Sequence, residues 1–318
     1  MAEVGLPFRN SLWYYKQTDY TTDPVYTDTT YAISCEWKVG RPGYGSDKHV
    51  ANYSADTPLS NTLWEQVDDF VFHLEYVPQC DDSMLTDVLN RDANGYLKSL
   101  GFMLGVNVDL AADADKTYYF LSGCKPKTVS ISASTNNKYT VAIDFSVRSI
   151  VTDGVGSAGG FITDSLSDLV ATEPSALTGA YLGFNVAGSI KDGSSNSLAD
   201  IVDNFEVTFD HGLRDEWDHD SKEKVKCIEG KYACTGSFDM SMDEGGGMHF
   251  MQVYNQKQFD VYVDLGGTGC PRLQLKNCKW RTWEQTSNTD DGAIKESCPF
   301  TARLDNDGKS VVTDTPAP

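Results

Sequence analysis

The chain has 318 residues, of which 40% are hydrophobic and 23% charged, a composition that is ordinary for a globular protein and excludes wholesale disorder. Its 46 acidic and 26 basic residues give a net charge of −20, so nucleic acid and anionic membranes repel it unless it carries a basic patch. We see neither a membrane-spanning apolar segment nor a secretory signal, and we therefore expect the protein to fold in a cytoplasm.

Strands dominate the predicted elements. Apolar and polar residues alternate with a period of two, the pattern of antiparallel sheets that have one buried face. Six segments show it: residues 70–76, 106–110, 139–147, 205–209, 238–242 and 259–265. Helical signals are few, at residues 82–97 (with Asp81 or Asp82 as N-cap), 166–172 and 247–258. The sequence therefore predicts a mainly β protein with a few flanking helices.

An internal repeat suggests two units. Residues 62–70 match residues 197–205 at an offset of 135, with Leu63 over Leu198. A second match places Cys124 over Cys278 and Phe145 over Phe300, at offsets of 154 and 155. The two copies predict a duplicated antiparallel β-sandwich or barrel, with domains at residues 1–160 and 161–318.

The segments outside these matches predict a joint and two arms. Residues 153–160 contain four glycines and indicate a flexible joint between the domains. The first 30 or so residues are rich in Tyr, Thr and Asp, and the last ten in Thr, Asp, Pro and Ala. We expect both ends to form arms rather than core.

The eight cysteines form no CxxC motif, which leaves no sign of a zinc ribbon or a thioredoxin-type site. Without a signal peptide, reduced and buried thiols are the default expectation. One pair of cysteines is a candidate for a disulfide. If a turn centres on Gly230 and Lys231, Cys227 and Cys234 face each other across a hairpin.

No catalytic or cofactor motif stands out. The densest polar cluster, residues 210–220, contains His211 and His219 and could hold a metal, but a solvated loop after a strand fits the spacing better. Residues 305–308 lack the later ligands of a calcium loop and predict a turn. We therefore predict no cofactor, no metal and no enzymatic activity.

Aspartate is disfavoured in strands, yet it recurs on the predicted polar strand faces. The positions are Asp109, Asp144, Asp239, Asp260 and Asp264. A solvated sheet face explains any one of them. Together they indicate that at least one sheet presents a surface lined with carboxylates.

These strand and turn patterns resemble tail tube proteins of long-tailed bacterial and archaeal viruses. In the first copy the resemblance rests on residues 105–108, 120–132 and 139–148. In the second copy it rests on the corresponding segments, which are residues 203–210, 232–238 and 277–303. It covers roughly residues 60–150 and 197–304, and its motifs are patterns of strands and turns rather than of chemistry.

The resemblance implies a structural virion protein, the major tail tube subunit. Such a subunit assembles in the host cytoplasm into (pseudo-)hexameric rings that stack into a channel for the genome. Its partners would be itself and other tail proteins (terminator, tape measure, baseplate or tip), with DNA passing without specific binding and no membrane contact. Two other classes stay open: a secreted or surface β-sandwich module that binds glycans, and a metal-assisted hydrolase built on His211 and His219.

Within a tube, the polar strand faces are the candidates for the channel lining. We expect Asp109, Asp239, Asp260 and Asp264 on the lumen side. Arms and loops are the candidates for contacts between subunits, and besides the C-terminal arm the expected contact residues are Trp13 and Tyr14 in the N-terminal arm, and Arg41, Pro42 and Tyr44 in the loop at residues 40–46.

Overall fold

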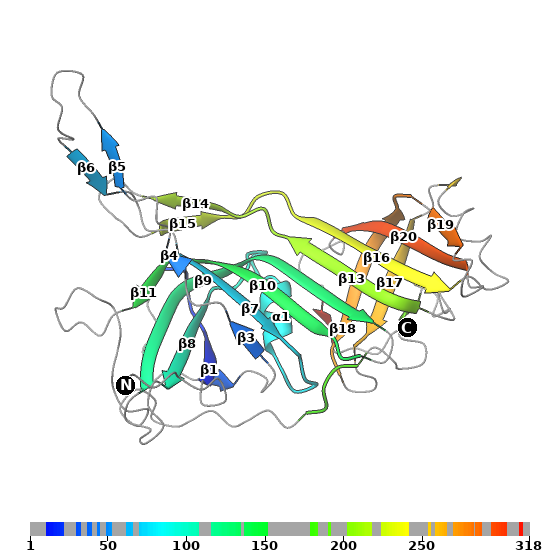
Figure 1. Ribbon diagram of the computed structural model, residues 1–318, viewed down its shortest axis with the longest axis horizontal. Helices are drawn as coiled ribbons and strands as arrows, with labels where there is room; N and C mark the ends of the chain where they lie inside the picture. Colours follow the sequence, from blue (N-terminus) through cyan, green and yellow to red (C-terminus); the bar gives the residue numbers. More distant parts are fainter. Residues whose placement is uncertain are drawn as a thin grey trace.

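Most of the residues that the computed structural model describes lie in antiparallel strands (Figure 1). The structure describes residues 11–21, 30–32, 37–39, 43–44, 49–52, 62–65, 70–107, 116–134, 137–151, 179–183, 190–191, 202–217, 224–241, 254–255, 258–265, 270–282, 284–287, 294–303 and 312–313. Predictions for residues 153–160, 166–172 and 305–308, and for most of 247–258, fall outside these residues.

The elements are short except for one strand. The first half contains β1 (Ser11–Lys16), β2 (Thr30–Ala32), β3 (Trp37–Val39), β4 (Gly43–Tyr44), β5 (His49–Asn52), β6 (Thr62–Glu65), β7 (Phe70–Tyr76), α1 (Met84–Leu89), β8 (Leu100–Asn107), β9 (Lys116–Ser134), β10 (Thr140–Val147) and β11 (Ser149–Val151). The second half contains β12 (Ile190–Lys191), β13 (Val202–Asp210), β14 (Arg214–Trp217), β15 (Lys224–Ile228), β16 (Ala233–Ser241), β17 (Gln258–Asp264), β18 (Arg272–Trp280), β19 (Glu284–Ser287), β20 (Ile294–Arg303) and β21 (Val312–Thr313).

A continuous run of antiparallel pairings crosses both halves of the chain. It starts with β3 and β4 on β7, continues through β10, β9, β13, β16 and β20, and ends at β19. We call these strands the shared sheet. Its central junction, β9 with β13, joins the two halves through seven paired residues, from Thr128 opposite Asp210 to Ser134 opposite Asn204.

The alternation predicted from the sequence explains which face of the shared sheet is buried. In β7, Phe72, Leu74 and Tyr76 are at most 1% exposed, whereas the residues between them face outward. β10 buries its odd-numbered apolar residues in the same way. The strand class and the buried face were therefore both predicted correctly, because burial of one sheet face forces a period of two.

A second group of strands packs against the buried face. It pairs β8 with β1 and with the first part of β9, which also pairs with β11. The Phe102 ring of β8 lies 5.0 Å from the ring of Phe72 and 4.9 Å from that of Phe145. β9 takes part in both groups, and its backbone passes from one to the other near Gly123, where φ is +63°.

The second half repeats this arrangement in its hydrogen-bond register. Leu100 lies opposite Cys124, and the register then shifts by a bulge in β9; Phe259 lies opposite Cys278, and the register shifts in the same sense. Asn277, which precedes Cys278 as Gly123 precedes Cys124, has a φ of +51° and is the one non-glycine residue with positive φ in the described chain.

The pairing of strands agrees with the second sequence match but not with the match at an offset of 135. β10 pairs with β7, and β20, which the second match places over β10, pairs with β16. Phe72 is opposite Phe145 and Gly236 is opposite Phe300, so an alignment of β20 with β10 places β16 over β7 at an offset of 164. The match at offset 135 placed β7 over β13, and the pairing does not support it, because alternating strands resemble one another at many offsets.

The helix and the N-terminal segment also differ from expectation. α1 ends at Leu89 rather than Leu97, because Asp92 organises a turn by accepting hydrogen bonds from the backbone of Asn94 and Tyr96, both at 2.8 Å. The N-terminal segment includes a core strand: β1 pairs along its whole length with β8.

The cysteines follow the default expectation in part. Cys124, Cys234, Cys278 and Cys298 are buried and take no part in a disulfide. Cys227 and Cys234 do not face each other, because Cys227 lies opposite Asp215 in the β14–β15 hairpin. Cys80 and Cys270 instead form a disulfide that links the two halves across 190 residues.

Candidate functional site

The outward face of the shared sheet is polar and acidic. On β7, β10, β9, β13 and β16 it carries mainly hydroxyl and carboxylate side chains, because the apolar residues of each strand point to the opposite face. Its described carboxylates are Glu75, Asp144, Glu206, Asp210 and Asp239, each exposed or half-buried. We call this surface the acidic face.

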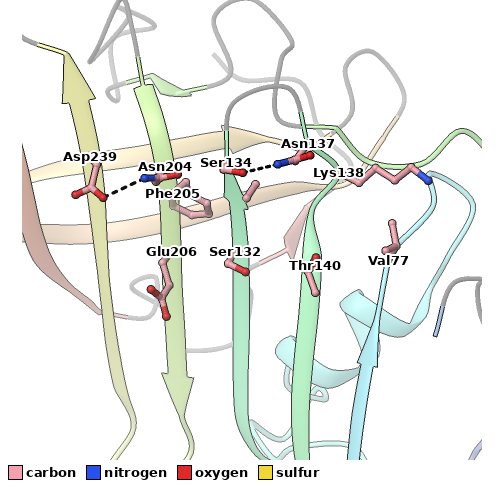
Figure 2. Close-up of a pocket in the computed structure, with 11 residues that line it drawn as sticks. Val77, Ser132, Ser134, Asn137, Lys138, Thr140, Asn204, Phe205, Glu206 and Asp239 are labelled. Atoms are coloured by element: carbon pink, nitrogen blue, oxygen red, sulfur yellow. Dashed lines mark hydrogen bonds between the residues drawn. The ribbon is translucent and has the colours of Figure 1, made fainter. Parts of the chain in front are cut away.

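Figure 2 shows the acidic face over the junction of the two halves. Glu206, Ser132 and Thr140 stand in one row across β13, β9 and β10, as their register requires. Asn204 donates a hydrogen bond of 3.3 Å to Asp239 on β16. These residues line an open depression of about 700 Å³ that crosses the junction.

One carboxylate of the acidic face is held in its ionised form. Asp144 lies 2.7 Å from His73 Nδ1 and accepts a hydrogen bond of 2.7 Å from the Thr128 hydroxyl. Partial burial acts to raise the pKa of Asp144, but the bonds from His73 and Thr128 and the charges of His73 and Lys127 outweigh it and lower that pKa. This part of the face therefore stays negative at neutral pH.

A hairpin from the second half docks on the first half. β14 and β15 leave the shared sheet between β13 and β16 and lie above β11 and β4 in Figure 1. At the foot of this hairpin Glu229, with a 9% exposed side chain, forms ion pairs with Arg91 and with Lys125, the latter at 3.2 Å. It also accepts a 2.7 Å hydrogen bond from the Leu97 backbone.

A second buried cation fixes the hairpin strands themselves. Lys224 on β15 is 1% exposed and pairs with Asp215 on β14 at 3.0 Å. Its ammonium group also donates to the Ser146 hydroxyl at 3.1 Å and towards the Phe70 carbonyl at 3.4 Å. The hairpin is therefore tied to β7 and β10 by satisfied charges, the condition under which a buried charge is tolerated.

Of the four predicted lumen residues, the two whose side chains the structure describes, Asp239 and Asp260, lie in different groups of strands. Asp239 lies on the acidic face. Asp260 lies on β17, outside the shared sheet, where it pairs with Lys276 at 3.0 Å and accepts a hydrogen bond from the Asn277 backbone. Asp109 lies outside the described residues, and for Asp264 the structure describes the β17 backbone only.

Of the predicted contact residues, Trp13 and Tyr14 have described side chains, and the other three do not. The Trp13 and Tyr14 side chains are 5% and 1% exposed, and the Tyr14 hydroxyl lies 2.6 Å from that of Ser83. Both side chains are buried within the chain itself, so we do not retain them as contacts. The Tyr14 ring packs against Phe102 of β8, and its hydroxyl donates a 3.3 Å hydrogen bond to Asp87 of α1. Arg41 and Pro42 lie outside the described residues, and Tyr44 is described as part of the β4 backbone.

The histidine pair offers no metal centre where it is described. His211 is 1% exposed and lies against the Tyr232 ring at 5.7 Å. Burial, followed by the positive charge of Arg91, lowers the pKa of His211 to about 4. Across the described residues no group of three metal-binding side chains gathers, and His219 falls outside them.

Sequence reasoning missed the polar anchors at the hairpin. Glu229 and Lys224 were not singled out, because isolated charges near a turn are common on surfaces. Their burial depends on the first half of the chain. No local sequence pattern predicts that Glu229 and Lys224 are buried. The only local feature near them is the lysine-rich segment 222–226, which is unusual in an acidic chain.

Comparison with known protein families gives a match to the chain. The family model described as phage tail tube protein matches residues 82–257, which is more than half of the chain. No curated protein matches the sequence. No described helix is long and apolar enough to cross a membrane.

Proposed function

Because the chain belongs to the phage tail tube protein family, we propose that its copies form (pseudo-)hexameric rings that stack into the channel for genome delivery. The protein is a structural component of the virion tail that is assembled in the host, and its family is not enzymatic. The family match carries the proposal. The family also implies self-assembly and association with other tail proteins, of which we propose terminator, tape measure and baseplate or tip proteins.

The acidic face is the surface that we propose as the channel lining. Fixed negative charge there repels phosphates, so DNA moves along the channel without the counterion release that holds it on basic proteins. Asp239 stays in this proposal, joined by Glu206 and Asp144, which share the face. Asp260 does not, because it lies on β17 and is paired with Lys276.

We also propose that the two halves are copies of one β-rich unit. The support is the shared register: the same bulge, the same buried cysteine and a residue of positive φ recur in β9 and β18. The copies are not independent domains, since one hydrophobic core and the β9–β13 pairing run through both. Three such chains would present six similar units around a ring.

Negative-stain microscopy of the purified protein tests the assembly. We expect rings or tubes with a central hole. Monodisperse monomers at high concentration, with no gain in order beside other tail proteins, would contradict the proposal.

Genome ejection tests the lining. Lysines in place of Asp239 and Glu206 should slow ejection more at low salt than at high salt, because exposed charges are screened over about 10 Å at 0.1 M. Glu216→Lys, on the β14–β15 hairpin, is the control for each single variant, Asp239→Lys or Glu206→Lys, because all three make the same charge change. Unchanged ejection at low salt from tails that contain the lysines would exclude the acidic face from the channel.

A further inference from the structure

The correspondence between the two halves extends to the elements at the edges of the shared sheet. β13 pairs with β16, and β3 and β4 pair with β7 at the matching positions: Gly43 opposite Val71 corresponds to Thr208 opposite Thr235. At the other edge, β19 corresponds to the last part of β9 at the offset of 154 given by Cys124 and Cys278. β3 and β4 together thus correspond to β13, and β19 to the end of β9.

The same correspondence relates the two hairpins. β14 and β15 lie between β13 and β16 in the sequence, and β5 and β6 lie between β4 and β7. Glu229 precedes Cys234 of β16 by five residues, and Glu65 precedes Phe70 of β7 by five residues. At the offset of 164 that relates β7 to β16, Glu65 therefore takes the place of Glu229.

Within the chain, β13 and the β14–β15 hairpin, both from the second half, meet the first half. β13 pairs with the edge of β9, and its hairpin docks beside β7 and β10. The equivalent elements meet nothing comparable. Among the described strands, β19 pairs with β20 alone, β3 and β4 pair with β7 alone, and β5 and β6 pair with each other. In Figure 1, β5 and β6 project from one end of the molecule, and β19 lies at the other.

The residues of the first half that the β14–β15 hairpin contacts are buried, whereas the corresponding residues of the second half are more exposed. Lys125, which contacts Glu229, is 8% exposed, and Ser146, which contacts Asp215, is 4% exposed. Lys279 and Thr301 take their places in the second half, and Lys279 is exposed and Thr301 half-buried. Among the described residues, the second half thus presents the corresponding surface without a hairpin over it.

We propose that the contact between neighbouring subunits copies the junction inside the chain. The occupant of the open edge and of the uncovered surface is a second copy of this chain. Its β3 and β4 pair with β19, its β5–β6 hairpin docks on the second half, and its Glu65 pairs with Lys279 of the partner subunit. This proposal rests on the proposed function, since it specifies how the rings close.

Physical reasons favour this contact. A contact between two different surfaces of one chain repeats from copy to copy and closes into a ring when its rotation allows. The rotation that relates the halves inside the chain is then reused between chains. Pairing also covers two strand edges that would otherwise invite aggregation.

Cysteine cross-linking tests the proposed register between β4 of one chain and β19 of the next. The junction inside the chain places Thr208 opposite Ser130, with their hydroxyl oxygens 3.0 Å apart. The corresponding pair between chains is Gly43 and Glu284. In a background with Cys35→Ser and Cys227→Ser, the variant with Gly43→Cys and Glu284→Cys should give, on oxidation, a ladder of multiples of the chain mass. The highest band counts the chains in one ring.

Two control variants isolate the register. Ser130→Cys with Thr208→Cys should cross-link within one chain and give no ladder. Gly43→Cys with Ser287→Cys, displaced by three residues, should give no ladder either. Rings or tubes that form without a Gly43–Glu284 ladder, while the in-chain control cross-links, would overturn the proposal and leave the proposed function standing. Absence of any assembly from the unmodified chain would refute the proposed function itself.

Charge reversal tests the ion pair. Glu65→Lys or Lys279→Glu should raise the protein concentration needed for assembly by about tenfold or more, equivalent to about 1.4 kcal/mol per contact. The double reversal should restore it. Glu206→Lys, which makes the same charge change on the acidic face, should leave it unchanged. Failure of the double reversal to restore assembly would contradict the pairing of Glu65 with Lys279 of the partner subunit.

Discussion

Removal of the Glu229 carboxylate tests whether the docked hairpin holds the two halves together. Glu229→Ala leaves Arg91 and Lys125 buried without their counter-charge, and each of these side chains is 10% exposed. It also removes the acceptor for the Leu97 backbone N–H. Breaking a buried pair by removing one partner costs about 3–5 kcal/mol, because the remaining charge stays desolvated. We expect a loss of that size in the free energy of unfolding.

Urea unfolding below the assembly concentration measures this loss. Glu229→Gln keeps an acceptor for the Leu97 backbone N–H but no charge, so it should fall between the wild type and the alanine variant. Glu206→Ala, at an exposed position, should change the free energy of unfolding by no more than about 0.5 kcal/mol. Glu65→Ala should behave like Glu206→Ala in the monomer. A loss for Glu229→Ala below about 1 kcal/mol would refute the view that these charges are held out of water.

Further predictions concern titration, the disulfide and core packing. The pKa of His211 is lowered to about 4 in the folded protein, so as the pH falls from about 6.5 to 4 the unfolded chain takes up a proton that the folded chain does not. The free energy of unfolding should therefore decrease over this range, and His211→Phe should remove that decrease in pH-dependent unfolding. Burial raises the pKa of Asp82 to about 6, which has the opposite effect: stability falls as pH rises from about 4 to 6, and Asp82→Asn should stabilise the protein at pH 8 but not at pH 4. Reducing the bond between Cys80 and Cys270, checked by peptide mapping, should lower the free energy of unfolding by up to about 5 kcal/mol in the chain-entropy model; no change would contradict a native link. Gly236→Ala should cost about 1–3 kcal/mol in urea unfolding, because the added Cβ would lie 2.5 Å from the Phe300 ring and 2.7 Å from a backbone oxygen; a neutral result would contradict this packing.

The strands of the shared sheet could be predicted from sequence because burial acts on every second residue. Phe72 and Leu74 in β7, and Phe145 in β10, mark the buried face without any knowledge of their partners. The same periodicity explains the error in the repeat. Alternating strands match at many offsets, so Phe70 aligned with Phe205 as readily as with Cys234, the residue that the sheet pairing places over it.

Other features required the tertiary structure. β1 lies in an N-terminal segment whose richness in Tyr, Thr and Asp suggested an arm, and its burial depends on β8, which is about 90 residues away along the chain. The Cys80–Cys270 bond joins positions that no local pattern connects. Asp239 and Asp260 looked equivalent as aspartates on polar strand faces, but β16 and β17 lie in different groups of strands.

Edge pairing and the acidic face can act independently because of strand geometry. Hydrogen bonds between strands run in the plane of a sheet, whereas side chains project perpendicular to it. Subunits that join through β19 and the β3–β4 edge therefore leave Glu206 and Asp239 in water, whatever the number of chains in the ring. A charge placed on this face should alter the passage of DNA without altering assembly, and a charge reversed at Glu65 or Lys279 should do the opposite. The two sets of variants therefore separate the channel lining from the contact that builds the channel.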